Sequence, residues 1–321
     1  MNDLLICLNA IVPVFLVIAV GWLAKRFGVI KESEVSRFNA ITFRVFMLLM
    51  CFYNVYSSDL ESAVRPRLTA YAVAGVAVMY LCSWLYAHFF VKERRCRGVV
   101  IQGLYRSNYL ILGLPIVSGL AGDVDLGAVS LLGAIIVPIF NVLAVVTLEV
   151  YDGERPKPGR LLLDIAKNPL IVGSLLGLAF LLLGIRLPRM LESGVRDLAR
   201  IASPLMLFLL GAFFRFDGVG AHRRELAAVC LGRLVIFPAI ALTLAYRLGF
   251  RGVDFVAMLA LFASPTAVSS FTMAQQMGGD AELAGNIVVV TSLLCSASFF
   301  AWSLLFKTMG PPHIFDQGLF K

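Results

Sequence analysis

The chain has 321 residues, of which 60% are hydrophobic and 15% are charged. Soluble domains carry about 45–50% apolar and about 25% charged residues, so this composition excludes an ordinary cytosolic enzyme, a disordered chain and a small secreted scaffold. The net charge of +8 is spread over short loops, which excludes a basic nucleic-acid-binding domain.

Ten apolar segments follow one another along the chain, each bounded by charged residues or by Pro and Gly. One membrane-spanning helix needs about 20 apolar residues, and each segment has that length. The start of the seventh segment is the least apolar, because it contains Arg196, Asp197 and Arg200. The pattern predicts an all-α integral membrane protein with ten transmembrane helices in a lipid bilayer. The segments are 4–24, 38–57, 68–90, 98–120, 126–149, 161–184, 190–214, 224–247, 253–276 and 282–307.

The distribution of Lys and Arg predicts the orientation of these helices. The loops after the first, third, fifth and seventh segments are richer in Lys and Arg than the loops on the other side. Cytoplasmic loops carry this excess, so both termini are predicted to lie outside an inner (cytoplasmic) membrane. Asp3 precedes the first apolar run, whereas Lys25 and Arg26 follow it. This order is the reverse of a cleavable signal peptide.

The two halves of the chain show a weak internal repeat. The run from Val45 to Phe52 aligns with the run from Met206 to Phe213. Because each half holds five helices, the halves would have opposite orientations, as in many secondary carriers. The predicted divisions are a first repeat at 1–150, a cytoplasmic connecting loop at 151–160, a second repeat at 161–310 and a short extracytoplasmic tail at 311–321.

The fourth and ninth segments are predicted to be broken helices. The fourth contains Ser107-Asn108 and then Gly113-Leu114-Pro115, and the ninth contains Ser264-Pro265-Thr266. Proline removes an intrahelical donor, and the backbone groups that it exposes are tolerated at membrane depth only beside protein or a wet cavity. The N-termini of half-helices attract anions. A Pro-kinked helix without a ligand is the alternative, but two breaks at matching places favour a binding site.

Three arginines lie inside apolar segments, at Arg44, Arg106 and Arg233. An arginine at mid-membrane costs about 2.5–3.5 kcal/mol on insertion scales and commonly marks a substrate pathway. These cations predict an attracting potential for a carboxylate. Alternatively, each side chain could extend to the lipid headgroups. Lone amides such as Asn54, Asn141 and Gln275 could line a cavity or link helices by hydrogen bonds.

The sequence predicts neither a catalytic centre nor a metal or cofactor site. His88, His222 and His313 are far apart and lack the spacing of metal ligands. The six cysteines include no C-x-x-C pair, and the common hydrolase and phosphate-loop motifs do not occur. An enzyme is therefore not expected.

Short motifs occur in a fixed order along nearly the whole chain. They include Asn108, Gly113 and Pro115 with the spacing N-x4-G-x-P. The others are Pro13, Gly28-Val29-Ile30, Arg37-Phe38-Asn39, Lys167-Asn168-Pro169, Leu210-Gly211, Pro265, Ala274, Gly278 and Asp280. In this order the chain resembles the auxin efflux carrier family, which includes bacterial malonate and malate permease-like carriers.

The resemblance implies two inverted five-helix repeats in which helices 4 and 9 cross. Helices 1, 2, 6 and 7 would form a scaffold that commonly dimerises, and the others a mobile transport domain that moves like an elevator. Asn108 corresponds to the substrate-contacting asparagine of the family, and Pro115 and Pro265 fall at its broken-helix positions. Ser107 and Gln275-Gln276 depart from the plant pattern, and the long loop of plant members is missing. These departures favour an organic-acid carrier over an auxin carrier.

The predicted function is therefore secondary transport of a small organic anion, a mono- or dicarboxylate such as malonate or malate. One alternative is a sodium-coupled symporter of bile acid-like or other amphipathic anions, with Thr266, Ser269, Ser270, Thr272 and Gln275 as possible sodium ligands. A second alternative, of another class, is a non-transporting membrane receptor or sensor for an organic acid. The predicted substrate-binding residues are Asn108, Ser107, Arg106, Pro115, Ser264, Pro265, Thr266, Arg44 and Arg233.

Overall fold

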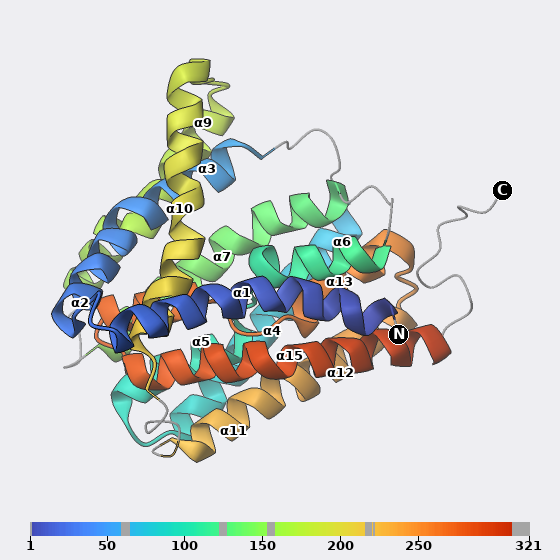
Figure 1. The fold of residues 1–321 in the computed structure, drawn as a ribbon. Coiled ribbons are helices and arrows are strands. Elements are labelled where there is room, and N and C mark those ends of the chain that lie inside the picture. Colours follow the sequence, from blue (N-terminus) through green and yellow to red (C-terminus); the bar gives the residue numbers. More distant parts are fainter. Residues whose placement is uncertain are drawn as a thin grey trace.

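The structure is a computed structural model that describes residues 2–58, 65–121, 127–152, 158–215, 220 and 222–309. These parts of the chain are helical, and the single isolated β-bridge within them joins Ser107 to Thr266. The helical packing is visible in Figure 1. The predicted tail 311–321 lies outside the described residues, as do positions 153–157 of the predicted connecting loop.

The first half of the chain contains five of the predicted apolar segments. The second segment is one long helix with a π-helical turn inside it, and the fourth is interrupted. The elements are α1 (Asn2–Arg26), α2 (Glu32–Ile41), η1 (Thr42–Phe46), α3 (Met47–Tyr56), α4 (Pro66–Phe90), α5 (Arg94–Tyr105), η2 (Tyr109–Gly113), α6 (Leu114–Ala121) and α7 (Gly127–Tyr151).

The second half contains a bent pair of helices, a helix with a π-helical turn inside it and an interrupted segment. A bend of 60° separates α8 from α9, next to Asn168, whose side chain caps α9 by accepting a hydrogen bond from the Leu170 N–H. The elements are α8 (Pro158–Lys167), α9 (Pro169–Leu182), α10 (Arg189–Phe213), α11 (Arg223–Leu231), η4 (Gly232–Ile236), α12 (Phe237–Arg247), α13 (Gly252–Ala263), α14 (Ser269–Gln276) and α15 (Ala281–Met309).

Six helices of the described residues are long and apolar enough to cross a membrane, and the bent pair α8–α9 would make a seventh. The remaining predicted segments fall short for physical reasons. The fourth and ninth are divided into shorter helices, and α10 carries the charges of Arg196, Asp197 and Arg200 in its first half. The all-helical, multi-pass prediction is confirmed at this level, and the ten-helix, two-repeat arrangement stays a prediction.

Helices α1, α3, α9 and α10 pack closely as one group. Helix α10 contacts α1 and α3, and α3 contacts α9. Glycine makes the close approach possible: a Cβ atom on Gly211 of α10 would overlap the Ile18 carbonyl of α1, and one on Gly173 of α9 would overlap the Leu48 carbonyl of α3. Small residues at such crossings are typical of membrane helices, because packing and not water drives their association.

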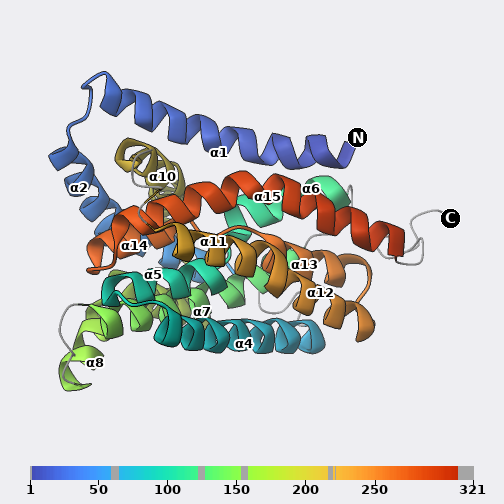
Figure 2. The same cartoon turned by 90° about the horizontal axis from the view of Figure 1, so that it is seen from below.

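The other helices surround the two interrupted segments. Helix α5 contacts α4, α7 and α15, and α13 contacts α7, α12 and α15. Helices α1 and α15 are in contact and antiparallel, so α1 begins and α15 ends at the same end of the molecule (Figures 1 and 2). The interrupted segments are therefore enclosed by long helices.

Candidate functional site

The first break separates α5 from the π-helical turn η2. Arg106 leaves the helical conformation with φ −83° and ψ 108°, and Asn108 precedes η2 with φ −81° and ψ 51°. Pro115 lies just after η2, in the first turn of α6. Since proline cannot donate a hydrogen bond to the preceding turn, the wider π-helical turn lies where the chain must adjust. The break itself lies upstream of Pro115.

The second break separates α13 from α14. Helix α13 ends at Ala263, and Ser264 is extended, with φ −67° and ψ 152°. This conformation is expected for a residue that precedes proline, and Pro265 follows it. The chain resumes a helix at Ser269.

The two breaks pair with each other as a short antiparallel bridge. The Asn108 N–H donates to the Pro265 carbonyl at 2.8 Å, and the Ala267 N–H donates to the Arg106 carbonyl at 3.1 Å. The Thr266 hydroxyl donates to the Gly103 carbonyl at 2.7 Å. Backbone groups that the helices leave unpaired are thus satisfied inside the protein, which is the condition for non-helical chain at membrane depth.

Arg233, on η4, binds the carboxyl ends of both interrupted helices. Its side chain is 0% exposed. Nε donates to the Ser264 carbonyl at 2.8 Å, Nη2 to Leu261 at 3.0 Å and Nη1 to Tyr105 at 3.4 Å. These carbonyls belong to the C-terminal ends of α13 and α5, where the helix dipole is negative. Arg233 therefore holds the two half-helices together and does not extend to the headgroups.

Arg106 is also buried, with 3% of its surface exposed, but it binds side chains. Nη2 donates to Asn141 Oδ1 at 2.5 Å, and Nη1 donates to Gln102 Oε1 at 3.2 Å and to Met273 Sδ at 2.7 Å. All three partners are uncharged, so in the described part of the chain no carboxylate is bonded to this guanidinium. A buried cation without a bonded acid creates a local positive potential.

Ser107 and Asn108 offer two hydrogen-bond donors beside Arg106. Both residues are buried. Within the described residues, Ser107 Oγ and Asn108 Nδ2 have no hydrogen-bond partner. A buried polar group left without a partner costs about 1–3 kcal/mol, so both groups are available to donate to a bound molecule.

A cavity of about 60 Å³ lies against these residues. One water molecule needs about 10–15 Å³ of such a cavity, so the space is large enough for a small solute. The first break contributes Arg106, Ser107 and Asn108, and the second contributes Ala267, Val268 and Ser269. The opposite walls come from α3 (Met50, Asn54), α7 (Phe140, Asn141) and α10 (Ser203, Met206). The cavity therefore lies between the interrupted helices and the group of α1, α3, α9 and α10.

Two half-helices begin at the cavity wall. The turn η2 starts at Tyr109 and α14 starts at Ser269, and both residues line the cavity. The N-terminal ends of helices carry partial positive charge and bare N–H groups. The cavity thus combines two helix N-termini, one buried guanidinium and two unpartnered donors.

The predicted site residues fall into three sets. Arg106, Ser107 and Asn108 line the cavity. Ser264, Pro265 and Thr266 form the second break without lining the cavity, and Arg233 binds the Ser264 carbonyl. Pro115 lies downstream of the first break and does not line the cavity either. Arg44 is exposed on η1 and does not line the cavity. The sequence had left open whether Asn141 lines a cavity or links helices; it does both, because it lines the cavity and accepts from Arg106.

A family model described as membrane transport protein matches residues 6–154 and 158–303. The chain belongs to this family, the auxin efflux carrier family that its motifs resemble. The prediction that the protein is a multi-pass membrane transporter and not an enzyme is thereby confirmed.

Curated relatives match along almost their entire length. An uncharacterized transporter of Methanocaldococcus jannaschii is 23% identical over 315 residues, which cover 94% of this chain and 100% of that protein. A Rhizobium meliloti protein named "Putative malonate transporter" is 23% identical over 300 residues, covering 90% of this chain and 92% of that protein. The uncharacterized transporter YfdV of Escherichia coli is 21% identical over 306 residues, covering 88% and 95%.

Proposed function

We propose that this family member is a secondary transporter of a small organic anion, a mono- or dicarboxylate such as malonate or malate. One observation carries the proposal: Arg106, whose bonded partners are uncharged, lies beside the unpartnered donors of Ser107 and Asn108 in a cavity between two helix groups. The name of the Rhizobium meliloti relative points to the same class of substrate.

The substrate carboxylate would accept hydrogen bonds from Asn108 Nδ2 and Ser107 Oγ. Hydrogen bonds to an ionised acceptor are roughly twice as strong as neutral ones, so the substrate would offset the cost of keeping these donors buried. The N-terminal ends of η2 and α14 and the Arg106 guanidinium add an attracting potential. A second carboxylate of a dicarboxylate would extend toward Asn54 and Ser203, which line the opposite wall.

The proposed movement is elevator-like. Helices α1, α2–α3, α9 and α10 would form the scaffold, and the interrupted segments with their neighbours would carry the substrate past it. The cavity lies at this boundary, so a displacement of one group against the other changes which side of the membrane it faces. Ten crossings in two inverted repeats, with both termini outside an inner membrane, complete the proposal.

The scaffold would also form a homodimer. Helix α9 supports this proposal, because Leu175, Leu176 and Leu182 expose large apolar side chains on it. A second copy or lipid would cover these side chains, and the mass of the detergent-solubilised protein distinguishes a dimer from a monomer.

Transport by proteoliposomes tests the function directly. Purified protein should take up labelled malonate or malate, and Asn108→Ala should reduce uptake about tenfold or more, since a lost hydrogen bond to a charged group costs about 1.5–3 kcal/mol. Asn286→Ala is the matched control, because Asn286 is an equally buried amide outside the cavity wall. Undiminished uptake by Asn108→Ala would refute the site, and no uptake of any mono- or dicarboxylate would refute the substrate class.

Sodium coupling is a second candidate, for which α14 offers one observation. Ser270 Oγ and Thr272 Oγ1 are buried without a partner within the described residues, and hydroxyl and carbonyl oxygens suit a hard cation. Uptake that requires sodium would support this version. Binding of the acid without any flux would instead indicate a receptor or sensor.

A further inference from the structure

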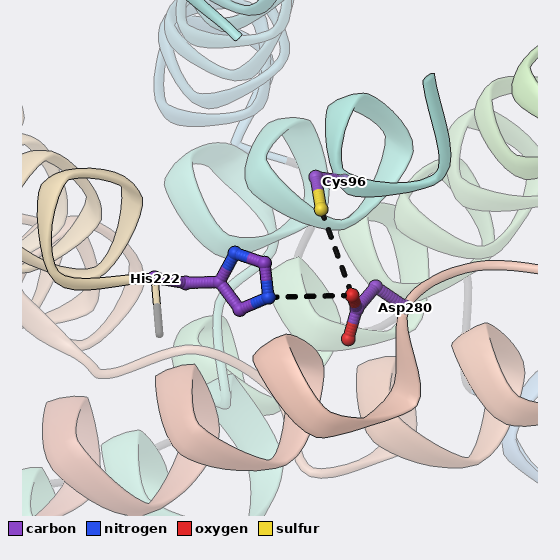
Figure 3. A group of neighbouring side chains, drawn as sticks. All are labelled: Cys96, His222 and Asp280. Carbon is purple, nitrogen blue, oxygen red and sulfur yellow. Dashed lines mark hydrogen bonds and ion pairs between the residues drawn. The ribbon is translucent and has the colours of Figure 1, made fainter. Parts of the chain in front are cut away.

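A second cluster of polar side chains lies away from the cavity. Cys96 is in the first turn of α5, His222 immediately precedes α11, and Asp280 immediately precedes α15. Figure 3 shows the three side chains pointing toward one another. A ligand atom of each lies within 4.8 Å of the other two. Three elements that are distant in sequence thus bring a thiol, an imidazole and a carboxylate together.

The separation of His222 and Asp280 fits a shared metal ion better than a direct hydrogen bond. His222 Nε2 and Cys96 Sγ each lie 3.6 Å from Asp280 Oδ2, and for the thiol this is a hydrogen-bond distance. A charge-assisted hydrogen bond between nitrogen and carboxylate is about 2.7–2.9 Å long. Ligand atoms at about 2.0–2.3 Å from a tetrahedral zinc ion are about 3.3–3.7 Å apart. Both separations lie within that range.

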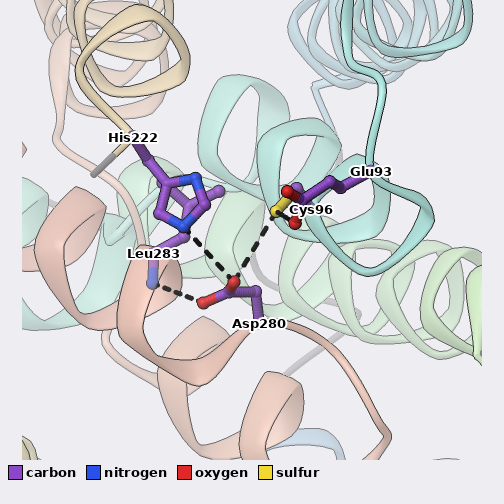
Figure 4. Close-up of polar contacts among 5 residues, drawn as sticks. All are labelled: Glu93, Cys96, His222, Asp280 and Leu283. Atoms are coloured by element: carbon purple, nitrogen blue, oxygen red, sulfur yellow. Dashed lines mark hydrogen bonds and ion pairs between the residues drawn. The ribbon is translucent and has the colours of Figure 1, made fainter. Parts of the chain in front are cut away.

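The surrounding contacts hold the carboxylate in place. Asp280 Oδ1 accepts a hydrogen bond from the Leu283 N–H at 2.8 Å, which leaves Oδ2 directed at His222 and Cys96 (Figure 4). Such outer contacts orient the ligands of metal sites. On the other side of the thiol, Glu93 Oε2 lies 3.6 Å from Cys96 Sγ, outside the group of three ligand atoms.

We propose that Cys96, His222 and Asp280 form a zinc-binding site. Thiolate, imidazole and carboxylate are the ligands that zinc takes, whereas calcium and magnesium take oxygen. On binding, the Cys96 thiol releases its proton to solvent, and a sulfur–zinc bond forms. The three protein ligands leave the fourth coordination position for a water molecule. The ion would link α5 to the starts of α11 and α15.

The sequence predicts no metal site because its histidines are far apart, and the fold removes that objection. A single histidine suffices when a cysteine and a carboxylate lie beside it. The site is independent of the proposed function, because none of its residues lines the substrate cavity. A protein that binds zinc and transports no carboxylate would therefore separate the two proposals.

Zinc binding by the full chain tests the site. Chelator-treated protein in detergent, dialysed against Zn²⁺, should retain about one ion per chain by elemental analysis. Cys96→Ser and Asp280→Asn should each weaken retention about tenfold or more. Cys82→Ser and His88→Ala are the matched controls, because both residues are exposed on α4, and they should bind zinc as the wild type does. Equal retention by Cys96→Ser and the wild type would overturn the proposal.

Cobalt gives a readout on the unaltered chain. Co²⁺ in the same site should show thiolate-to-cobalt charge-transfer absorption, and Zn²⁺ should abolish that absorption by displacement. Zinc should also raise the unfolding temperature of the wild type, since an ion that binds the folded state stabilises it. A wild-type cobalt complex without the thiolate absorption would overturn the assignment, whether or not the variants fold.

Discussion

Arg106 and Arg233 are both buried, yet they face different partners. Among the described residues, the Arg233 guanidinium donates only to backbone carbonyls, whereas Arg106 donates to side chains, of which Asn141 lines the cavity. Arg44 is exposed on η1. Arg233 therefore stabilises the two breaks, Arg106 lies at the cavity wall, and Arg44 lies at neither place.

Removing the Arg233 guanidinium should destabilise the protein strongly. Arg233→Met would leave the carboxyl ends of α5 and α13 uncapped, and each lost hydrogen bond from a charged group costs about 1.5–3 kcal/mol. The expected result is a fall in unfolding temperature, measured by thermal denaturation in detergent. Arg44→Met is the control and should shift stability by no more than about 0.5 kcal/mol. Similar losses in both variants would contradict the capping role.

For single residues, the sequence predicts which side chains lie near the breaks better than it predicts which partner each side chain binds. Ser107 and Asn108 were selected because they lie beside a predicted break, and both line the cavity. The three arginines share their place within an apolar run, and the sequence separates Arg106 from the other two only by its position two residues before Asn108. What separates them is the direction of the side chain and the partner it meets, and both depend on helices distant in sequence.

At the scale of helices, the two breaks differ in how far the sequence explains them. Pro265 lies inside its break, whereas Pro115 follows η2 and the first break begins at Arg106. No proline lies at residues 106–108. The reason is non-local: these residues leave the helix to pair with residues 265–267. Local propensity predicts that a break occurs, and tertiary pairing decides where.

The contact between α1 and α10 makes a second prediction about helices. Gly211→Ala should destabilise the protein by about 1–3 kcal/mol, because its Cβ would overlap the Ile18 carbonyl and overpacking costs this much. Gly194→Ala lies in the same helix with no atom within 4 Å of the added carbon. It should be neutral or stabilising by up to about 1 kcal/mol.

Thermal or detergent unfolding of the two glycine variants measures the difference. Equal stability would show that α1 and α10 can separate without cost. A loss confined to Gly211→Ala would confirm that these helices pack backbone to backbone.

For the whole molecule, composition was enough to predict a multi-pass helical protein. Among the described residues, six or seven helices are long and apolar enough to cross a membrane. The other predicted segments are broken into shorter helices or carry charges, so length and apolarity alone do not identify them as crossings. Composition does not predict that α1, α3, α9 and α10 pack together. Their grouping depends on contacts between helices that are distant in sequence, and in the sequence analysis only the family resemblance implies it.

Cysteine labelling tests the predicted orientation. In a background without the exposed Cys82, a membrane-impermeant reagent should label Met190→Cys in intact cells and Val29→Cys only after permeabilisation. Both positions are exposed, at 87% and 78%, and the cation bias places the loop containing Val29 in the cytoplasm. The opposite pattern would reverse the topology, and labelling of both in intact cells would contradict the odd number of crossings predicted between them.

The pairing of the two breaks also bears on how the chain is made. The Asn108 N–H finds its acceptor at Pro265, and the Arg106 carbonyl finds its donor at Ala267. During synthesis the first half leaves the ribosome well before these partners exist. The centre of the protein is therefore assembled late, and a chain terminated before Pro265 would insert its early helices while lacking the acceptor that completes them.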